Sequence, residues 1–317
     1  MIYTIYHKTE FSYQNMVTYS HNMARLKPKE TAYQKVLDFS LDIDAFPFEK
    51  REFHNMFGNV CTHIVIKNSH HSLSVTGRSR VEIFPEMIDV HIADIKANSI
   101  TYKAAKERLK SFVERDIEAK QFMFDSQLIA PATDEMKAYA LESFKDERDM
   151  FEAAYEFMGR IYHDFEFLSG FSDVTTPVSE IFKAKKGVCQ DFAQFAISAL
   201  RGIGLPCKYV SGYIETLPAK GEKKLFGADA SHAWFSLYIP NAGWIEFDPT
   251  NNVIPKQQHI ILGYGRDYAD IAPLKGVVFS SGASRLSVMV DVREEVLQEQ
   301  NQEQSFFGFK SQTQTQG

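Results

Sequence analysis

The chain has 317 residues, enough to bury a sizeable core, and this length predicts two domains or one large domain. Charged residues make up 24% and apolar residues 44%, a balance that excludes wholesale disorder. The formal net charge is −6, and no basic stripe with interleaved aromatic residues is present. We therefore expect no nucleic-acid partner.

The sequence also carries a prediction about location. No apolar run is long enough to span a bilayer, and the first residues lack the basic-then-apolar layout of a signal peptide. The three cysteines, Cys61, Cys189 and Cys207, are too few and too odd in number for a disulfide framework. We expect a cytoplasmic protein with no membrane partner, in which Cys61 and Cys207 are small buried side chains.

The first hundred residues predict strands, which we assign to a sandwich-like antiparallel β domain over residues 1–98. Apolar and polar residues alternate over 33–43 and again over 73–83, as in half-buried strands. Phe57-Gly58-Asn59 predicts a turn before a third alternating run over 60–66. One face of this domain should be solvated and the other buried.

The period then changes to that of helices. Apolar residues recur at helical spacing over 102–117, inside a predicted helical connection at 99–130, and again over 150–162. Thr176-Pro177 predicts an N-cap followed by proline at the first helical position. A further helix should run from Cys189 to Arg201, because two glycines and a proline follow it.

The last part of the chain predicts more strands, so the fold class is α+β. Their ranges are 209–216, 233–239, 244–247 and 286–292, and the turn at 240–243 joins the second and third of them as a hairpin. We assign residues 131–297 to a catalytic core that includes these C-terminal strands. Residues 298–317 are rich in Gln, Ser and Thr and predict a disordered tail.

Three residues in this core carry the predicted chemistry. Cys189 lies in the first turn of its helix, where unpaired N–H groups and the helix dipole favour the reactive thiolate. His232 begins one strand of the hairpin and Asp248 ends the other, so both should lie at the same end of adjacent strands. Asp248 can then bind one ring nitrogen of His232 and leave the other for Cys189. The Cys189 backbone N–H is a candidate oxyanion donor.

Each of the three residues also has a purely structural interpretation. Cys189 could be a small buried apolar residue, His232 a core histidine, and Asp248 a turn former before proline. A zinc site made by the three residues lacks the closely spaced ligand pair typical of such sites, and no calcium loop is present. The joint arrangement favours a nucleophilic cysteine enzyme, for which we expect no metal and no cofactor.

Five segments in the same order resemble the bacterial transglutaminase-like superfamily. They are Gly187-Val188-Cys189-Gln190-Asp191-Phe192-Ala193 and residues 201–206, 209–213, 230–234 and 247–251. Residues 265–273 extend the match. Near the N-terminus, His7-Lys8-Thr9 and Phe57-Gly58-Asn59 are similar to the β domain that precedes the core in these bacterial proteins. The resemblance covers nearly the whole chain except the tail.

The resemblance implies a papain-like, transglutaminase-like core in which the nucleophile helix packs on an antiparallel sheet. It implies Cys189 as nucleophile, His232 as general base and acid, and Asp248 as the residue that orients His232. Gln194 stands where relatives commonly have histidine, but it is not expected in the triad. No side-chain oxyanion partner can be assigned, and only Tyr155 and Tyr162 are available upstream.

These observations together predict cysteine-dependent acyl transfer on a peptide, isopeptide or amide bond, with water as the acceptor. Many relatives of this type are described as cysteine proteases, so a peptide or protein substrate is expected. One alternative is a cross-linking transglutaminase, a protein-glutamine gamma-glutamyltransferase that passes the acyl group to a lysine amine. A second alternative is a non-catalytic interaction module, which the three intact triad positions disfavour. The segment 266–270 either lines the cleft or forms a structural ion pair.

Overall fold

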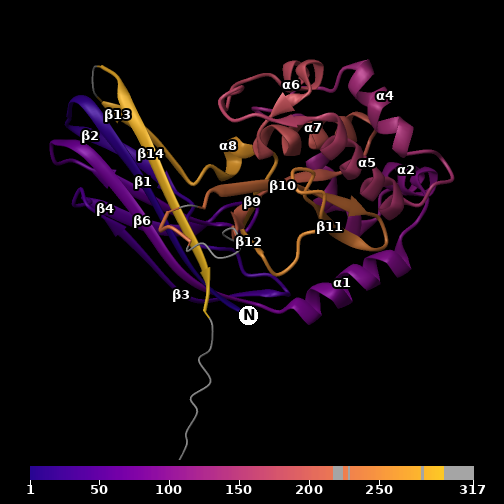
Figure 1. The fold of residues 1–317 in the computed structure, drawn as a ribbon, viewed down its shortest axis with the longest axis horizontal. Coiled ribbons are helices and arrows are strands. Elements are labelled where there is room, and N and C mark those ends of the chain that lie inside the picture. Colours follow the sequence, from indigo (N-terminus) through magenta and orange to yellow (C-terminus); the bar gives the residue numbers. More distant parts are fainter. Residues whose placement is uncertain (217–223, 228, 280–281, 296–317) are drawn as a thin grey trace, which may run out of the picture.

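The computed structural model describes residues 1–216, 224–227, 229–279 and 282–295. Two four-stranded antiparallel sheets form a β domain on one side of the molecule, with strand orders β14-β1-β6-β3 and β13-β2-β5-β4 (Figure 1). Six of these eight strands come from the N-terminal region, and three of the six contain the alternating runs over 33–43, 60–66 and 73–83. The bounds are β1 (Ile2–Val17), β2 (Tyr19–Ala24), β3 (Gln34–Ile43), β4 (Glu49–His54), β5 (Val60–Ile66), β6 (His70–Ile83), β13 (Leu274–Phe279) and β14 (Ser284–Glu294).

The end of the chain completes this β domain. β14 pairs with β1 from Tyr3↔Glu294 to Tyr13↔Ser284, and β13 pairs with β2. The prediction that the C-terminal strands belong to the catalytic core is therefore wrong for β13 and β14, because alternation identifies a strand but not its partner. The first and the last strand that the structure describes, β1 and β14, therefore lie side by side (Figure 1). The predicted tail at 298–317 lies outside the described residues.

A helix closes the N-terminal region, where the sequence pattern predicts only strands up to residue 98. This helix, α1 (Pro85–Asn98), begins with proline in its first turn and buries Ile88, Ile92 and Ile95. Proline is favoured at a helix start, and the spacing of the three isoleucines places them on one face. Because they join the main core cluster, α1 leads the chain from the β domain to the core.

The core is built on a third sheet with the strand order β11-β10-β9-β12. Its strands are β9 (Cys207–Ile214), β10 (Ser231–Ile239), β11 (Gly243–Phe247) and β12 (His259–Gly265). The helices of the core are α2 (Tyr102–Lys110), α3 (Ile117–Lys120), α4 (Asp134–Ser143), α5 (Met150–Asp164), α6 (Val178–Ala184), α7 (Cys189–Gly202) and α8 (Tyr268–Ile271). Of these, α5 and α7 pack on the sheet on its side away from the β domain, whereas α8 lies next to β12 (Figure 1). Within the described ranges, no helix is long and apolar enough to cross a membrane.

The start of α6 differs from its prediction by one residue. Pro177 occupies the N-cap position and the helix begins at Val178. The Thr176 hydroxyl does not cap the helix, because it accepts the N–H of Asp173 at 3.0 Å in the preceding turn. A Thr-Pro pair therefore marked the helix start correctly without supplying the cap.

Arg201 joins the end of α7 to the start of β9. Its guanidinium is buried and donates to the carbonyl oxygens of Phe122, Cys207 and Arg266 at 2.7–3.1 Å. Burial lowers the pKa of Arg201 to about 10, so it remains a cation at neutral pH. These bonds fix the position of α7, and hence of the cysteine at its other end, against the sheet.

Candidate active site

The site begins at the N-terminus of α7, where Cys189 is the first helical residue. Val188 holds the N-cap position, and its N–H donates to the carboxylate of Asp191 at 2.8 Å. The Ser172 hydroxyl donates to the same carboxylate oxygen. A Cβ on Gly187 would lie 2.6 Å from that oxygen, so only glycine leaves room for Asp191 to reach back. The Gly-Val-Cys-Gln-Asp segment is thus a fixed helix start that presents the thiol.

The core hairpin brings His232 and Asp248 together as predicted. Phe235 in β10 pairs with Phe247 in β11, which sets the two residues at the same end of adjacent strands. His232 Nε2 donates to Asp248 Oδ2 at 2.7 Å, and both side chains are buried. Cys189 hydrogen-bonds to the imidazole of His232. The structure therefore gathers all three predicted residues, two from a hairpin and one from a helix start.

The buried charges of this group stabilise one another. Burial alone would lower the pKa of His232, but its hydrogen bonds to Asp248 and Cys189 outweigh this and raise it. Burial alone would raise the pKa of Asp248, but hydrogen bonds from His232 and His259 hold it well below its usual range. Asp248 is therefore a carboxylate at neutral pH, and it favours a charged imidazolium beside the cysteine.

Asp248 receives more hydrogen bonds than a triad alone requires. Its Oδ2 accepts hydrogen bonds from His232, from His259 Nε2 at 3.0 Å and from Asn251 Nδ2 at 2.7 Å. Its Oδ1 accepts the backbone N–H groups of Thr250 and Asn251. His259 begins β12, a strand absent from the sequence-based prediction. The sequence around His259, a single histidine before an apolar run, does not indicate a role in the site. His259 reaches Asp248 only because β12 pairs with β9.

We expect His259→Leu to lower kcat about tenfold with little change in KM, because Asp248 would lose a donor and hold His232 less firmly. His259→Gln should retain most of the rate, since an amide N–H can replace the ring donor. Steady-state kinetics of the two variants tests this. Equal kcat for wild type and a folded His259→Leu protein would show that His259 only packs against Trp234, whose ring centroid lies 5.3 Å away.

His232, Asp248 and His259 are also the group of described residues whose ligand atoms, all within 4.8 Å, could hold a metal ion. Their Nε2–Oδ2 distances of 2.7 and 3.0 Å are those of hydrogen bonds. Ligand atoms around a tetrahedral zinc ion would lie about 3.4 Å apart, given bonds of about 2.1 Å. The spacing of these three side chains therefore fits hydrogen bonds between them better than coordination of a metal ion.

A hollow of about 300 Å³ opens over Cys189 and His232. Its aromatic lining is Phe167, Tyr209 and Tyr268. Tyr155 and Tyr162, the two upstream candidates for an oxyanion partner, are exposed on α5 and do not line this hollow. The tyrosines that line it with Cys189 are Tyr209 and Tyr268.

The segment at 266–270 forms a structural ion pair. The guanidinium of Arg266 binds the carboxylate of Asp270 through two bonds at 2.8 and 3.0 Å, and Asp267 caps α8. This segment also places Tyr268 in the hollow. Both interpretations offered by the sequence thus apply, to different residues of the segment.

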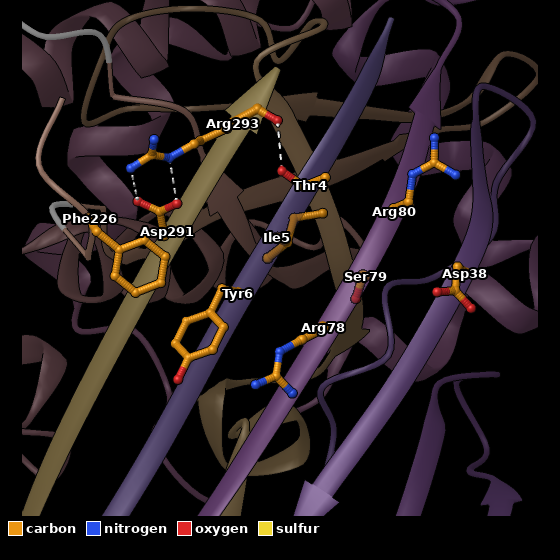
Figure 2. A pocket seen from close by; sticks show the side chains of 10 residues that line it. All are labelled: Thr4, Ile5, Tyr6, Asp38, Arg78, Ser79, Arg80, Phe226, Asp291 and Arg293. Atoms are coloured by element: carbon orange, nitrogen blue, oxygen red, sulfur yellow. Dashed lines mark hydrogen bonds and ion pairs between the residues drawn. The ribbon is translucent and has the colours of Figure 1, made fainter. Parts of the chain in front are cut away.

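A larger hollow, of about 590 Å³, lies away from the triad on the sheet of β1, β6 and β14 (Figure 2). Its arginines are already paired with carboxylates. Arg293 binds Asp291, Arg80 binds Glu295 just outside the hollow, and Arg78 binds Asp42. Size alone therefore does not make it the reactive site, because its described lining contains neither cysteine nor histidine and its arginines are paired with carboxylates.

Two family descriptions match the chain. Residues 3–82 match the bacterial transglutaminase-like N-terminal region, and residues 137–249 match the transglutaminase-like superfamily. An uncharacterized protein of Mycobacterium bovis is 34% identical over 297 residues, which are 92% of each chain. The chain belongs to the transglutaminase-like superfamily. The resemblance inferred from the sequence is thereby confirmed.

The fold agrees with this membership. A solved structure from Cytophaga hutchinsonii, described as a "putative cysteine protease", has a TM-score of 0.69 and 20% identity, covering 92% of this chain and 90% of that one. The predicted α+β class with an N-terminal β domain is therefore confirmed. A protein-glutamine gamma-glutamyltransferase of Pseudomonas aeruginosa is 34% identical over 79 residues, 24% of this chain and 12% of that protein.

Proposed function

We propose that the protein is a cysteine-dependent hydrolase acting on a peptide, isopeptide or amide bond. One observation carries this proposal: the imidazole of His232 lies between the thiol of Cys189 and the carboxylate of Asp248. A thiol at a helix start beside an imidazolium is activated as a nucleophile. Membership of the transglutaminase-like superfamily supports the same chemistry.

The proposed reaction has two steps. The Cys189 thiolate attacks the carbonyl carbon and forms a C–S bond, and the C–N bond breaks as His232 gives its proton to the leaving amine. Water then attacks the thioester carbonyl while His232 takes one of its protons, and the C–S bond breaks. This releases a carboxylic acid and restores the Cys189 thiolate beside the His232 imidazolium. The backbone N–H of Cys189 faces the developing oxyanion in both steps.

Transfer to an amine is the second candidate, and the match to a protein-glutamine gamma-glutamyltransferase over 79 residues favours it. The same thioester would then be opened by a lysine amine instead of water. We favour water, because Cys189 is partly exposed and lies in a hollow with a polar wall of Gln190, Ser211 and Ser231. Water can reach the thioester there.

The acceptor can be measured directly. We expect that a cleavable acyl donor, incubated with enzyme and a labelled primary amine, gives mainly free acid, and mass spectrometry of the products tests this. Cys189→Ala serves as the control for uncatalysed release. If amide predominates at millimolar amine without added calcium, the protein is a transglutaminase.

We also propose a peptide or protein as substrate and a reducing, cytoplasmic setting. The hollow over Cys189 is lined by apolar and polar groups and carries no excess charge apart from the triad, which suits a peptide chain. All three cysteines are free thiols. A nucleophilic thiol with no disulfide partner is maintained most readily in a reducing compartment.

A further inference from the structure

The face of the core sheet that points away from α7 carries a buried lysine with no polar partner. Lys208 follows Cys207 in β9 and is only 8% exposed. Its neighbour Tyr209 belongs to the core cluster shared with α7, so alternation turns Lys208 to the opposite face. No described residue forms a hydrogen bond or ion pair with its ammonium. Lys208 lines a hollow, so its ammonium is left to water or to a bound ligand for its hydrogen bonds.

Aromatic rings surround this ammonium. Its nitrogen lies 3.7 Å from the ring centroid of Tyr264 and 4.2 Å from that of Trp244. Trp244 in turn packs edge-to-face on Phe122 at 5.3 Å. These rings satisfy the charge in part through cation–π attraction, but they accept none of its three N–H bonds.

A hollow of about 290 Å³ opens onto Lys208, and its wall includes Phe122, Trp244, Tyr264 and, at the rim, Glu118. It shares no lining residue with the hollow over Cys189. Lys208 pairs with Ser236, four positions along β10 from His232, so the two sites lie roughly 13 Å apart along the sheet.

We propose that this hollow is a second binding site, which takes a small planar monoanion such as an aromatic carboxylate. The oxygens of a carboxylate supply the acceptors that Lys208 lacks, and a flat ring fits between aromatic walls.

The charges around the hollow select a single negative charge. The carboxyl group of Glu246 lies near Lys208 and accepts hydrogen bonds from Trp234 Nε1 at 2.9 Å and Tyr264 Oη at 3.1 Å. Glu118 adds a second carboxylate at the rim. A polyphosphate or dicarboxylate would approach both carboxyl groups, with Lys208 as the one cation among the described residues that line the hollow, so a monoanion is favoured.

Titration with benzoate tests the proposal on the full chain. Trp244 lies in the hollow, so its fluorescence should change with saturation, and calorimetry should give the same affinity. We expect benzamide, the neutral analogue, to bind at least about tenfold more weakly, because it lacks the charge that pairs with Lys208. Equal binding of benzoate and benzamide, or no saturable binding of benzoate, would overturn the proposal.

Two variants locate the site. Lys208→Met keeps the unbranched stem against the rings but removes the charge, and we expect at least about a tenfold loss of benzoate affinity. Cys189→Ala is the matched control and should bind as the wild type does, which separates this site from the proposed active site. An unchanged affinity in Lys208→Met would rule the lysine out.

The unmodified protein offers a second test that does not depend on how the variant folds. Burial lowers the pKa of Lys208 to about 8, with Lys29 lowering it further and Glu246 opposing. The ammonium is charged below that pH, so benzoate affinity should fall as the pH rises through about 8. Burial raises the pKa of Cys207 and of Tyr264, so both neighbours stay protonated over this range. An affinity that is flat from pH 7 to 9 would contradict the proposed role of Lys208.

Discussion

We expect Cys189→Ala to abolish turnover, lowering kcat/KM by roughly 1,000-fold or more, while the protein stays folded. The reason is that no covalent intermediate can form without the sulfur, whereas the fold loses little. Cys189 is only partly buried at the first position of α7, and alanine suits a helix. Steady-state kinetics and a melting curve of the purified variant measure the two effects separately.

The other two cysteines supply matched controls. Cys61 and Cys207 are almost fully buried, and burial raises the pKa of both thiols, so neither is available as a thiolate at neutral pH. Cys61→Ala and Cys207→Ala should therefore keep most of the activity, at some cost in stability. Iodoacetamide should label Cys189 before the other two cysteines, and the loss of activity should follow the extent of Cys189 labelling. Undiminished turnover in a folded Cys189→Ala protein would remove the proposed mechanism.

The parts of this site that the sequence predicts are those set by local pattern. The helix from Cys189 and the hairpin that joins His232 to Asp248 depend on residues close together in the chain, where periodicity and turn chemistry decide the structure. Bringing the three residues together requires one long-range contact, the packing of α7 on the sheet. That contact was expected from the family resemblance and not from local pattern.

The parts that the sequence did not predict depend on pairing between distant segments. His259 reaches Asp248 only because β12 lies beside β9, and β14 completes the β domain only because it pairs with β1. Alternation within a strand is the same whichever neighbour it has, so neither pairing could be read from it. The missed helix at α1 is different, because Pro85 and the isoleucine spacing were visible signals.

We expect Asp248→Asn to lower kcat by about 100- to 10,000-fold while KM changes little. Asparagine has nearly the same shape and can still accept a hydrogen bond, but it carries no charge. It therefore neither stabilises the His232 imidazolium nor holds the ring in the form that leaves its other nitrogen for Cys189. Binding of the substrate is spared, because Asp248 is buried and does not line the hollow.

The pH dependence of the Asp248→Asn variant separates this role from a structural one. In the wild type, the hydrogen bond to Asp248 raises the pKa of His232, so the imidazolium that forms the ion pair persists to higher pH. With the carboxylate gone, burial of the ring dominates and its pKa falls. The alkaline limb of the pH–rate profile should then move to lower pH, whereas a merely loosened turn would leave its position unchanged. An unshifted limb together with an unchanged kcat would mean that Asp248 belongs to the turn before Pro249 and takes no part in the proton transfer.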